Sequence, residues 1–455
     1  MEQKKYLKWY HKLGHSSGDF GSNFMFTFVS SFMMIYLTDT VGLNAAVIGM
    51  LIMAAKLLEC VTGLFFGNLL DNTHSKMGKA RPWVFYAAFP MGICQILLFM
   101  IPDTWQNLQY VYFFLVYVLL NAVFYTANNI SYTTLSVMIT RNSSERVQLS
   151  SIRMMFAYIA GILISTVTLN LVGDFGGGAA GWRSVAIIYT LIMLFFNSIA
   201  VFSAKELPGE AKQAEEENRI DKKDEKLGVI YILKTLFKNK FFWILMLYNA
   251  LFYASNAIAS GTAVYYFLHV IGNPSLMGVC ALAGMVPTLI GLVATPFLVS
   301  RFGIYKVTVI GMISSAILTI PYAYGSFNAN LGLIIIFSIL KGLGAAPIMG
   351  CNSAITADVA HYTYLKEGVH LEGSIFSVGS IGIKFGSGFG SALCGFLLSI
   401  GGYLGTASVQ TQDAILTLKL LFGVLPFVFA AAMAVILAML KVQYANEKLE
   451  ANCRA

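Results

Sequence analysis

Long uncharged runs of hydrophobic residues recur along this chain, and short stretches between them hold most of its charged side chains. Each run is close to the roughly 20 residues that an α-helix needs to cross the hydrocarbon core of a bilayer. The pattern predicts twelve membrane-spanning helices, at residues 19–38, 44–69, 83–101, 108–138, 149–172, 183–203, 241–268, 275–300, 304–325, 329–359, 373–401 and 413–440. We therefore expect an all-α integral membrane protein.

The composition supports this interpretation. Hydrophobic residues make up 57% of the 455 residues and charged residues only 11%, which leaves too little polar surface to cover a water-soluble globule. The six cysteines are scattered, without the spacing of a metal site, and no nucleophile and base are arranged for catalysis. We expect the lipid bilayer as a partner, and no enzyme, catalytic residue, metal site or cofactor.

Lysine and arginine are distributed unevenly among the loops. They gather in the N-terminus, in alternate loops such as 76–81, in the segment 205–240 and in the C-terminal tail, whereas the other loops carry almost none except Arg183. Positive charge stays on the cytoplasmic side. The pattern predicts a multi-pass protein of the cell membrane with both termini in the cytoplasm. The net charge of +8 thus reports topology and does not indicate binding to nucleic acid.

The longest hydrophilic stretch, "KELPGEAKQAEEENRIDKKDEKLG", separates the first six predicted spans from the last six. It predicts an N-terminal six-helix half at 1–204, a cytosolic linker at 205–240, a C-terminal six-helix half at 241–440 and a cytosolic tail at 441–455. Two such halves are the architecture of major facilitator transporters, whose substrate site lies between them near the middle of the membrane. We expect a monomer.

Polar residues recur at helical spacing inside three predicted spans. Residues three and four apart share one face of a helix, so each set forms a stripe: Asp19, Asn23, Thr27 and Ser30; Asn121, Tyr125, Asn129, Tyr132 and Ser136; Asn249, Tyr253, Asn256 and Ser260. Hydrogen bonding between packed helices would explain them. A cavity lining explains stripes on spans 1, 4 and 7 better, so Tyr125 and Asn256 are candidate substrate contacts.

Charged residues deep within the predicted spans include Lys56, Glu59, Arg153, Lys341 and Lys384. Lys56 could reach the interface or simply neutralise Glu59, but charges inside a membrane more often mark function. A carboxylate beside a cation can bind and release a proton or a sodium ion. Four cations against one deep carboxylate predict an electropositive cavity and hence an anionic substrate.

Two other patterns have structural interpretations. "GIKFGSGFG" places Gly382, Gly386 and Gly390 four apart, which predicts close approach of a neighbouring helix. His15 and His361 lie near the cytosolic ends of spans, as does His370 in the loop before span 11, and we expect them to be solvated or to cap helices.

The segment "GNLLDNTHSKMGKARPWVF" resembles the loop between spans 2 and 3 of the glycoside–pentoside–hexuronide:cation symporters. "GDFGSNF", "YLTDTVGL", "YNALFYASN", "YYFLHVIG" and "DVAHYTYLKEGVHLEG" extend this resemblance over nearly the whole chain. The resemblance implies the major facilitator fold and cation-coupled transport of a sugar, glycoside or hexuronide. It also implies that the basic loop, with Asp71, Lys79 and Arg81, and Asp358 after span 10 belong to a cytosolic gate.

The resemblance assigns further roles one residue at a time. Sugar-binding acidic positions fall on Asn23 and Asn129, and basic positions on Arg153 and Lys384, while Lys341 remains a candidate because of its buried charge. The first acid of the cation site is Glu59, near Lys56, and a hydroxyl position matches Thr126, but the second acid falls on Gly63.

The missing second acid bears on the coupling ion. Sodium prefers several oxygen ligands, whereas a proton needs one titratable group, so we favour a co-transported proton over sodium. Uncoupled transport, a carrier of amphiphilic lipid-like or steroid-like acids, and a non-transporting sensor or scaffold remain alternatives.

Overall fold

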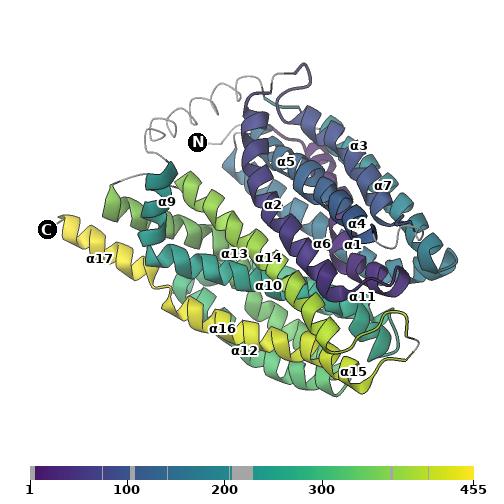
Figure 1. Ribbon diagram of the computed structural model, residues 1–455. Coiled ribbons are helices and arrows are strands. Elements are labelled where there is room, and N and C mark those ends of the chain that lie inside the picture. The colour runs from purple at the N-terminus through teal and green to yellow at the C-terminus, as the bar shows by residue number, and fades with distance from the viewer. Residues whose placement is uncertain are drawn as a thin grey trace. The chain divides into compact units, whose positions relative to one another are not determined.

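The computed structural model describes residues 6–73, 75–102, 108–140, 142–203, 205–207, 229–368, 372–407 and 409–454, and helices form most of this part of the chain (Figure 1). Eleven of the described helical segments are long and apolar enough to cross a membrane. The remaining predicted span corresponds to α3 (Arg81–Leu98), which is only 18 residues long, begins with a charged residue and carries Gln95 inside. The prediction of an all-α, multi-pass membrane protein is confirmed.

The chain forms two compact units. Unit 1 comprises Met1–Glu215, Ser260–Gly278 and Ser391–Ile415, and unit 2 comprises Glu216–Ala259, Val279–Gly390 and Leu416–Ala455. Residues 260–269 and 391–400, which end two long helices of the second half of the chain, therefore pack with unit 1.

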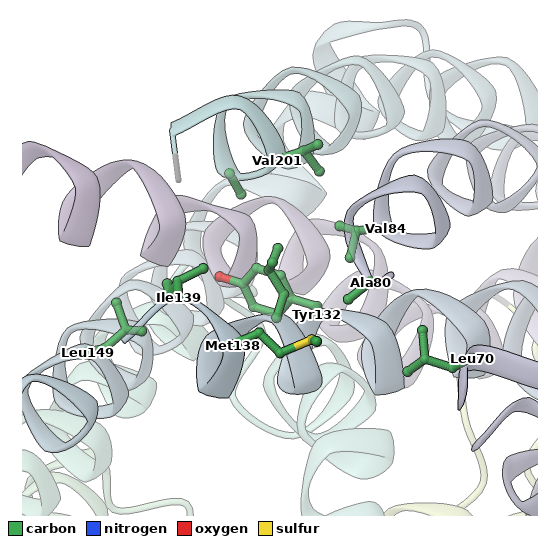
Figure 2. Close-up of a cluster of buried hydrophobic side chains, with 10 residues drawn as sticks. Leu70, Ala80, Val84, Tyr132, Met138, Ile139, Leu149 and Val201 are labelled. Carbon is green, nitrogen blue, oxygen red and sulfur yellow. The ribbon is translucent and has the colours of Figure 1, made fainter. Parts of the chain in front are cut away.

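Unit 1 contains most of the helices from the first half of the chain. They are α1 (Trp9–Ile35), η1 (Tyr36–Thr40), α2 (Ala45–Asp71), α3, α4 (Gln109–Val118), η2 (Leu119–Tyr125), α5 (Thr126–Met138), α6 (Ser143–Asp174) and α7 (Gly178–Ser203). Helix α1 packs along α6 and α7, and α3 packs along α5 and α7. One buried cluster joins the ends of several of these helices: Leu70, Ala80, Val84, Tyr132, Leu135, Met138, Ile139, Leu149, Ala200 and Val201 (Figure 2).

The first residues of the described chain are fixed by one carboxylate. Glu145, near the start of α6, accepts hydrogen bonds from the backbone N–H groups of Tyr6 and Leu7 and from the Thr140 hydroxyl, and it lies 3.7 Å from the Lys12 ammonium. Burial raises the pKa of Glu145, but the hydrogen bonds and Lys12 together outweigh burial and lower that pKa below its ordinary value. The ionised carboxylate thus anchors the N-terminal segment to unit 1.

The second half of the chain forms α9 (Val229–Lys238), α10 (Lys240–His269), α11 (Leu276–Phe302), α12 (Ile304–Phe327), α13 (Leu331–Glu367), α14 (Glu372–Ile400), α15 (Gln412–Lys419), η3 (Leu420–Val424), α16 (Leu425–Met439) and α17 (Val442–Arg454). Helix α12 packs along α13 and α16. A single residue, Gly303, connects α11 to α12 with φ of 81°, a conformation that a residue with a side chain rarely adopts.

The glycines of α14 lie against α10, as the sequence predicts. A Cβ atom at Gly386 would overlap the backbone of Ala250, and one at Gly390 would overlap Ala254. A Cβ atom at Gly382 would lie 3.0 Å from the backbone oxygen of Met246, a less close approach than at the other two glycines. The stripe therefore allows the two helix backbones to approach closely.

Candidate functional site

An ion pair between α1 and α6 forms the centre of the candidate site. Both carboxylate oxygens of Asp19 accept hydrogen bonds from Arg153, one from Nε and the other from Nη2 at 3.3 Å. Nη1 of Arg153 donates to the Ser136 hydroxyl at 2.6 Å, and the guanidinium lies over the Tyr132 ring, 4.5 Å from its centroid. Each of the three guanidinium nitrogens therefore has an acceptor within unit 1.

Residues of the protein interior support this ion pair. Tyr132 occupies the middle of the buried cluster in Figure 2, and its hydroxyl donates to the backbone oxygen of His15. The His15 ring stacks on Tyr132 with centroids 4.7 Å apart, and its Nε2 lies 2.9 Å from the Ser136 hydroxyl. His15 is fully buried, so the expectation that it is solvated or caps a helix is wrong. Gly18 leaves room for this stack, because a Cβ there would lie 2.7 Å from the Tyr132 ring.

The ion pair faces a cavity of about 250 Å³ lined by Asp19, Ser150, Arg153, Met154 and Ala157. The two charged side chains remain 16% and 17% exposed. A carboxylate accepts hydrogen bonds and a guanidinium donates them, so this wall can pair with a hydroxyl group in either role. The predicted position of Arg153 in a polar site agrees with this geometry.

Asp19 is the residue that the sequence interpretation undervalued. It belongs to the span 1 stripe, but the count of deep charges omitted it and the resemblance pointed to Asn23, one turn further along α1. Asn23 donates to the backbone oxygen of Asp19 at 2.8 Å, and Thr27 donates weakly to Asn23 at 3.5 Å. The sequence feature that could have identified Asp19 is its acidic side chain, one helical turn before Asn23, the position to which the resemblance assigns sugar binding.

The predicted stripe of span 4 is interrupted by a π-helix. Asn121 and Tyr132 are buried, whereas Asn129 is exposed. The intervening η2 is a π-helix, whose wider turn rotates the residues after it relative to those before it. The Thr126 hydroxyl donates to the backbone oxygen of Asn121 at 2.8 Å and so satisfies a carbonyl within this turn. Asn129, Tyr132 and Ser136 all follow η2 in the regular helix α5 and keep their shared face, so the wider turn changes only the position of Asn121 relative to them.

The pair on α2 forms as predicted. Lys56 Nζ lies 2.8 Å from Glu59 Oε2, and the two side chains are 11% and 10% exposed. Helix α2 packs against η2, where Tyr125 stacks on Phe26 of α1 with centroids 5.6 Å apart.

Three further predicted residues belong to unit 2. Lys341 of α13 lies 3.4 Å from the ring centroid of Tyr322 on α12, in a cation–π contact. Asn256 of α10 is exposed and donates to the backbone oxygen of Phe252. Lys384 of α14 is half-buried.

The predicted gate loop is held by a residue from the predicted linker. The backbone N–H groups of Lys79, Ala80 and Arg81 donate to the carboxylate of Glu206 at 2.7, 2.9 and 3.0 Å, where the N-terminus of α3 favours a negative charge. Nε of Arg81 donates to the backbone oxygen of Val201 near the end of α7. The side chain of Asp71 lies outside the described residues.

The other predicted gate residue, Asp358, contacts the C-terminal helix. Its carboxylate accepts a hydrogen bond from Gln443 at 3.0 Å, and its backbone oxygen accepts one from Asn446. His361 pairs with Glu450 of the same helix at 2.9 Å, on an exposed surface. These contacts attach α17 to α13. His370 lies outside the described residues.

A second polar network in unit 1 was not predicted. Tyr403 donates to both carboxylate oxygens of Asp39 at 3.0 and 2.9 Å, and His269 Nε2 lies 2.9 Å from the same hydroxyl. Burial and the neighbouring Asp39 raise the pKa of Tyr403, so the phenol stays protonated and donates. The network joins η1 to segments 230 and 364 residues further along the chain.

Several known proteins are similar to this chain in sequence over nearly its whole length. The family model of MFS/sugar transport proteins matches residues 14–443. An isoprimeverose transporter of Lactiplantibacillus pentosus is 29% identical over 99% of this chain and 92% of its own. A protein of Escherichia coli (strain K12) that is named for glycoside/cation symport is 26% identical over 94% of this chain and 91% of its own.

Among solved structures, a bacterial homologue of the human lysosomal transporter Spinster, in an inward-facing and unoccupied conformation, superposes with a TM-score of 0.71. It covers 97% of this chain and 99% of its own at 14% identity, which speaks for the fold alone. The family match and this likeness confirm the major facilitator fold. The family and these relatives are transporters, not enzymes. The chain therefore belongs to the MFS/sugar transport protein family, and its resemblance to the glycoside–pentoside–hexuronide:cation symporters is confirmed.

Proposed function

We propose that this protein is a secondary active transporter that carries a sugar or glycoside across the cell membrane by alternating access. The observation that best supports it within the molecule is the Asp19–Arg153 pair on the wall of a cavity, since such a pair can hydrogen-bond sugar hydroxyls. In this proposal both termini are cytoplasmic, the linker is 205–240, and the protein works as a monomer.

The proposed substrate contacts extend beyond this pair. They are Asn23, Tyr125, Asn129, Asn256, Lys341 and Lys384. The proposed gate comprises Asp71, Lys79, Arg81 and Asp358. Glu206 accepts hydrogen bonds from the backbone at the N-terminus of α3 and so holds the loop with Lys79 and Arg81 in one conformation, which supports a gating role for this loop.

We propose a proton as the coupling ion, bound by Glu59 with Lys56, Thr126 and Lys384 as further members of the coupling site. The close contact of Glu59 with Lys56 supports this choice, since a proton on the carboxylate would release the lysine. The membrane potential contributes about 2.3 kcal/mol per charge per 100 mV, which is enough for useful accumulation. A sodium ion would require additional oxygen ligands.

Counterflow in proteoliposomes tests the transport function without any ion gradient. Vesicles are loaded with an unlabelled glycoside, a trace of the labelled compound is added outside, and a transient overshoot is expected. The absence of an overshoot with every sugar, in folded protein, would refute the proposal, and an overshoot with lipid-like or steroid-like acids would establish the amphiphile carrier.

Glu59→Gln separates exchange from coupling. We expect this variant to keep counterflow but to lose accumulation driven by an imposed pH gradient, because its side chain cannot bind a proton. Thr62→Val on the same helix is the matched control. Accumulation at the wild-type level would remove Glu59 from the coupling role, and accumulation restricted to a sodium gradient in the wild type would identify sodium instead.

A further inference from the structure

We propose that Asp19 determines substrate charge: it is a built-in carboxylate that occupies Arg153, so the site accepts uncharged sugars and rejects sugar acids such as hexuronides. This inference rests on the proposed transport function and narrows its substrate class.

The balance of charge near the site changes once Asp19 is included among the buried charged residues. Four cations against one deep carboxylate suggested an electropositive cavity and an anionic substrate. With Asp19 included, Arg153 and Lys56 each have a carboxylate at hydrogen-bonding distance. Lys341 lies on the face of the Tyr322 ring. The cavity lined by Asp19 and Arg153 therefore carries a paired charge and not the excess of positive charge that an anionic cargo would need.

The geometry of Arg153 also disfavours a substrate carboxylate. Bidentate recognition of an anion requires two N–H groups of the guanidinium fork. Here Nε and Nη2 already form one such fork with the two oxygens of Asp19, and one N–H of Nη1 holds the Ser136 hydroxyl, so three of the five N–H groups are used. The Tyr132 ring covers one face of the guanidinium, and the stacked His15 behind it is buried, so the arginine cannot easily turn toward another acceptor.

A sugar acid would therefore meet a negative charge on the cavity wall. It would either lie beside Asp19 or displace it, and displacement would leave a largely buried carboxylate without its cation, which is costly. A neutral sugar has no such conflict, because its hydroxyl groups can donate to the remaining lone pairs of Asp19 and accept from Arg153. The pair thus discriminates by repulsion as well as by attraction.

The test compares ligands that differ only in charge. Counterflow of a labelled neutral glycoside is inhibited with methyl β-D-glucuronide and with the corresponding uncharged C6 amide. In the wild type we expect the amide to compete at least about tenfold better than the acid, as expected for a lost or repelled charge-assisted contact.

Asp19→Asn keeps the size of the side chain and removes its charge. We expect the ratio of the two inhibition constants to shift by about tenfold or more toward the acid, because Arg153 becomes available to it. Asp39→Asn, the same substitution at another acid of the first span that does not line the cavity, should leave the ratio unchanged. If Asp19→Asn does not fold, the double variant Asp19→Asn with Arg153→Gln removes both charges together, and its ratio should fall toward one.

Several outcomes would overturn the proposal. Equal competition by acid and amide in the wild type would do so without any variant, as would a wild-type ratio that persists when Asp19 is neutralised. A purely structural role for Asp19 would lower the amount of folded protein but would not move the ratio. Failure of every sugar to drive counterflow would instead refute the transport function itself, so the two failures are distinguishable.

Discussion

The Lys56–Glu59 pair allows a quantitative test of how this fold accommodates charge inside the membrane. Both side chains are about nine-tenths buried and their charged atoms lie 2.8 Å apart. Removing one partner of a buried pair typically costs about 3–5 kcal/mol, because the other charge stays buried. Since the side chains keep about a tenth of their surface accessible, we expect Glu59→Gln to lower the free energy of unfolding by about 3 kcal/mol, the low end of that range.

A double-mutant cycle isolates the pair from the rest of the site. Replacing a buried ion pair by uncharged side chains of similar volume is often nearly neutral, so Lys56→Met with Glu59→Gln should be much closer to the wild type than the sum of the single variants. The expected coupling free energy is about 2–3 kcal/mol. The assay is denaturant unfolding of purified protein in mixed micelles, and Lys306→Met, at an exposed lysine, serves as the control. A single-variant cost below about 1 kcal/mol, or strictly additive single costs, would refute the reasoning.

Three further predictions concern the structure around the site. Glu206→Ala should destabilise unit 1 by about 1–2 kcal/mol in the same unfolding assay, because three N–H groups at the α3 N-terminus lose their acceptor; a loss below the measurement error would contradict this role. The stabilisation from Glu145 should be complete above its ordinary pKa of 4.5 and be lost as the pH falls through its lower folded-state pKa, so that Glu145→Gln flattens the acid limb of the pH–stability profile; an unchanged limb would exclude it. Gly386→Val should abolish folding or sharply reduce expression because it forces α10 and α14 apart, whereas Gly284→Ala, where a Cβ meets nothing within 4 Å, should be tolerated; equal tolerance would show that the helices do not need this close approach.

Much of this molecule could be predicted from local patterns. The apolar runs predicted the spanning helices, and the four-residue spacing of Gly382, Gly386 and Gly390 predicted a close helix contact that the structure confirms. The pairing of Lys56 with Glu59 also followed from spacing, because residues three apart on one helix are neighbours whatever the rest of the fold does.

Other features depended on breaks in helical regularity. The π-helix at Leu119–Tyr125 rotates Asn129 and Tyr132 together relative to Asn121, a change of phase in span 4 that a regular α-helix would not have. Nothing in the hydrophobic pattern of that run indicates the wider turn, because a π-helical segment and an α-helical one have the same apolar composition.

The sequence by itself determined the membrane class, the span positions and the pairs within one helix, because these follow from hydrophobicity and from the short-range geometry of the α-helix. Only the tertiary structure decided which polar and charged groups pair between distant segments of the chain. Asp19 and Arg153 are separated by 134 residues, Glu206 and Lys79 by 127, and Asp39 and Tyr403 by 364. Such contacts arise from the packing of helices whose facing surfaces no local pattern specifies, and they decide whether a buried cation is available to a substrate.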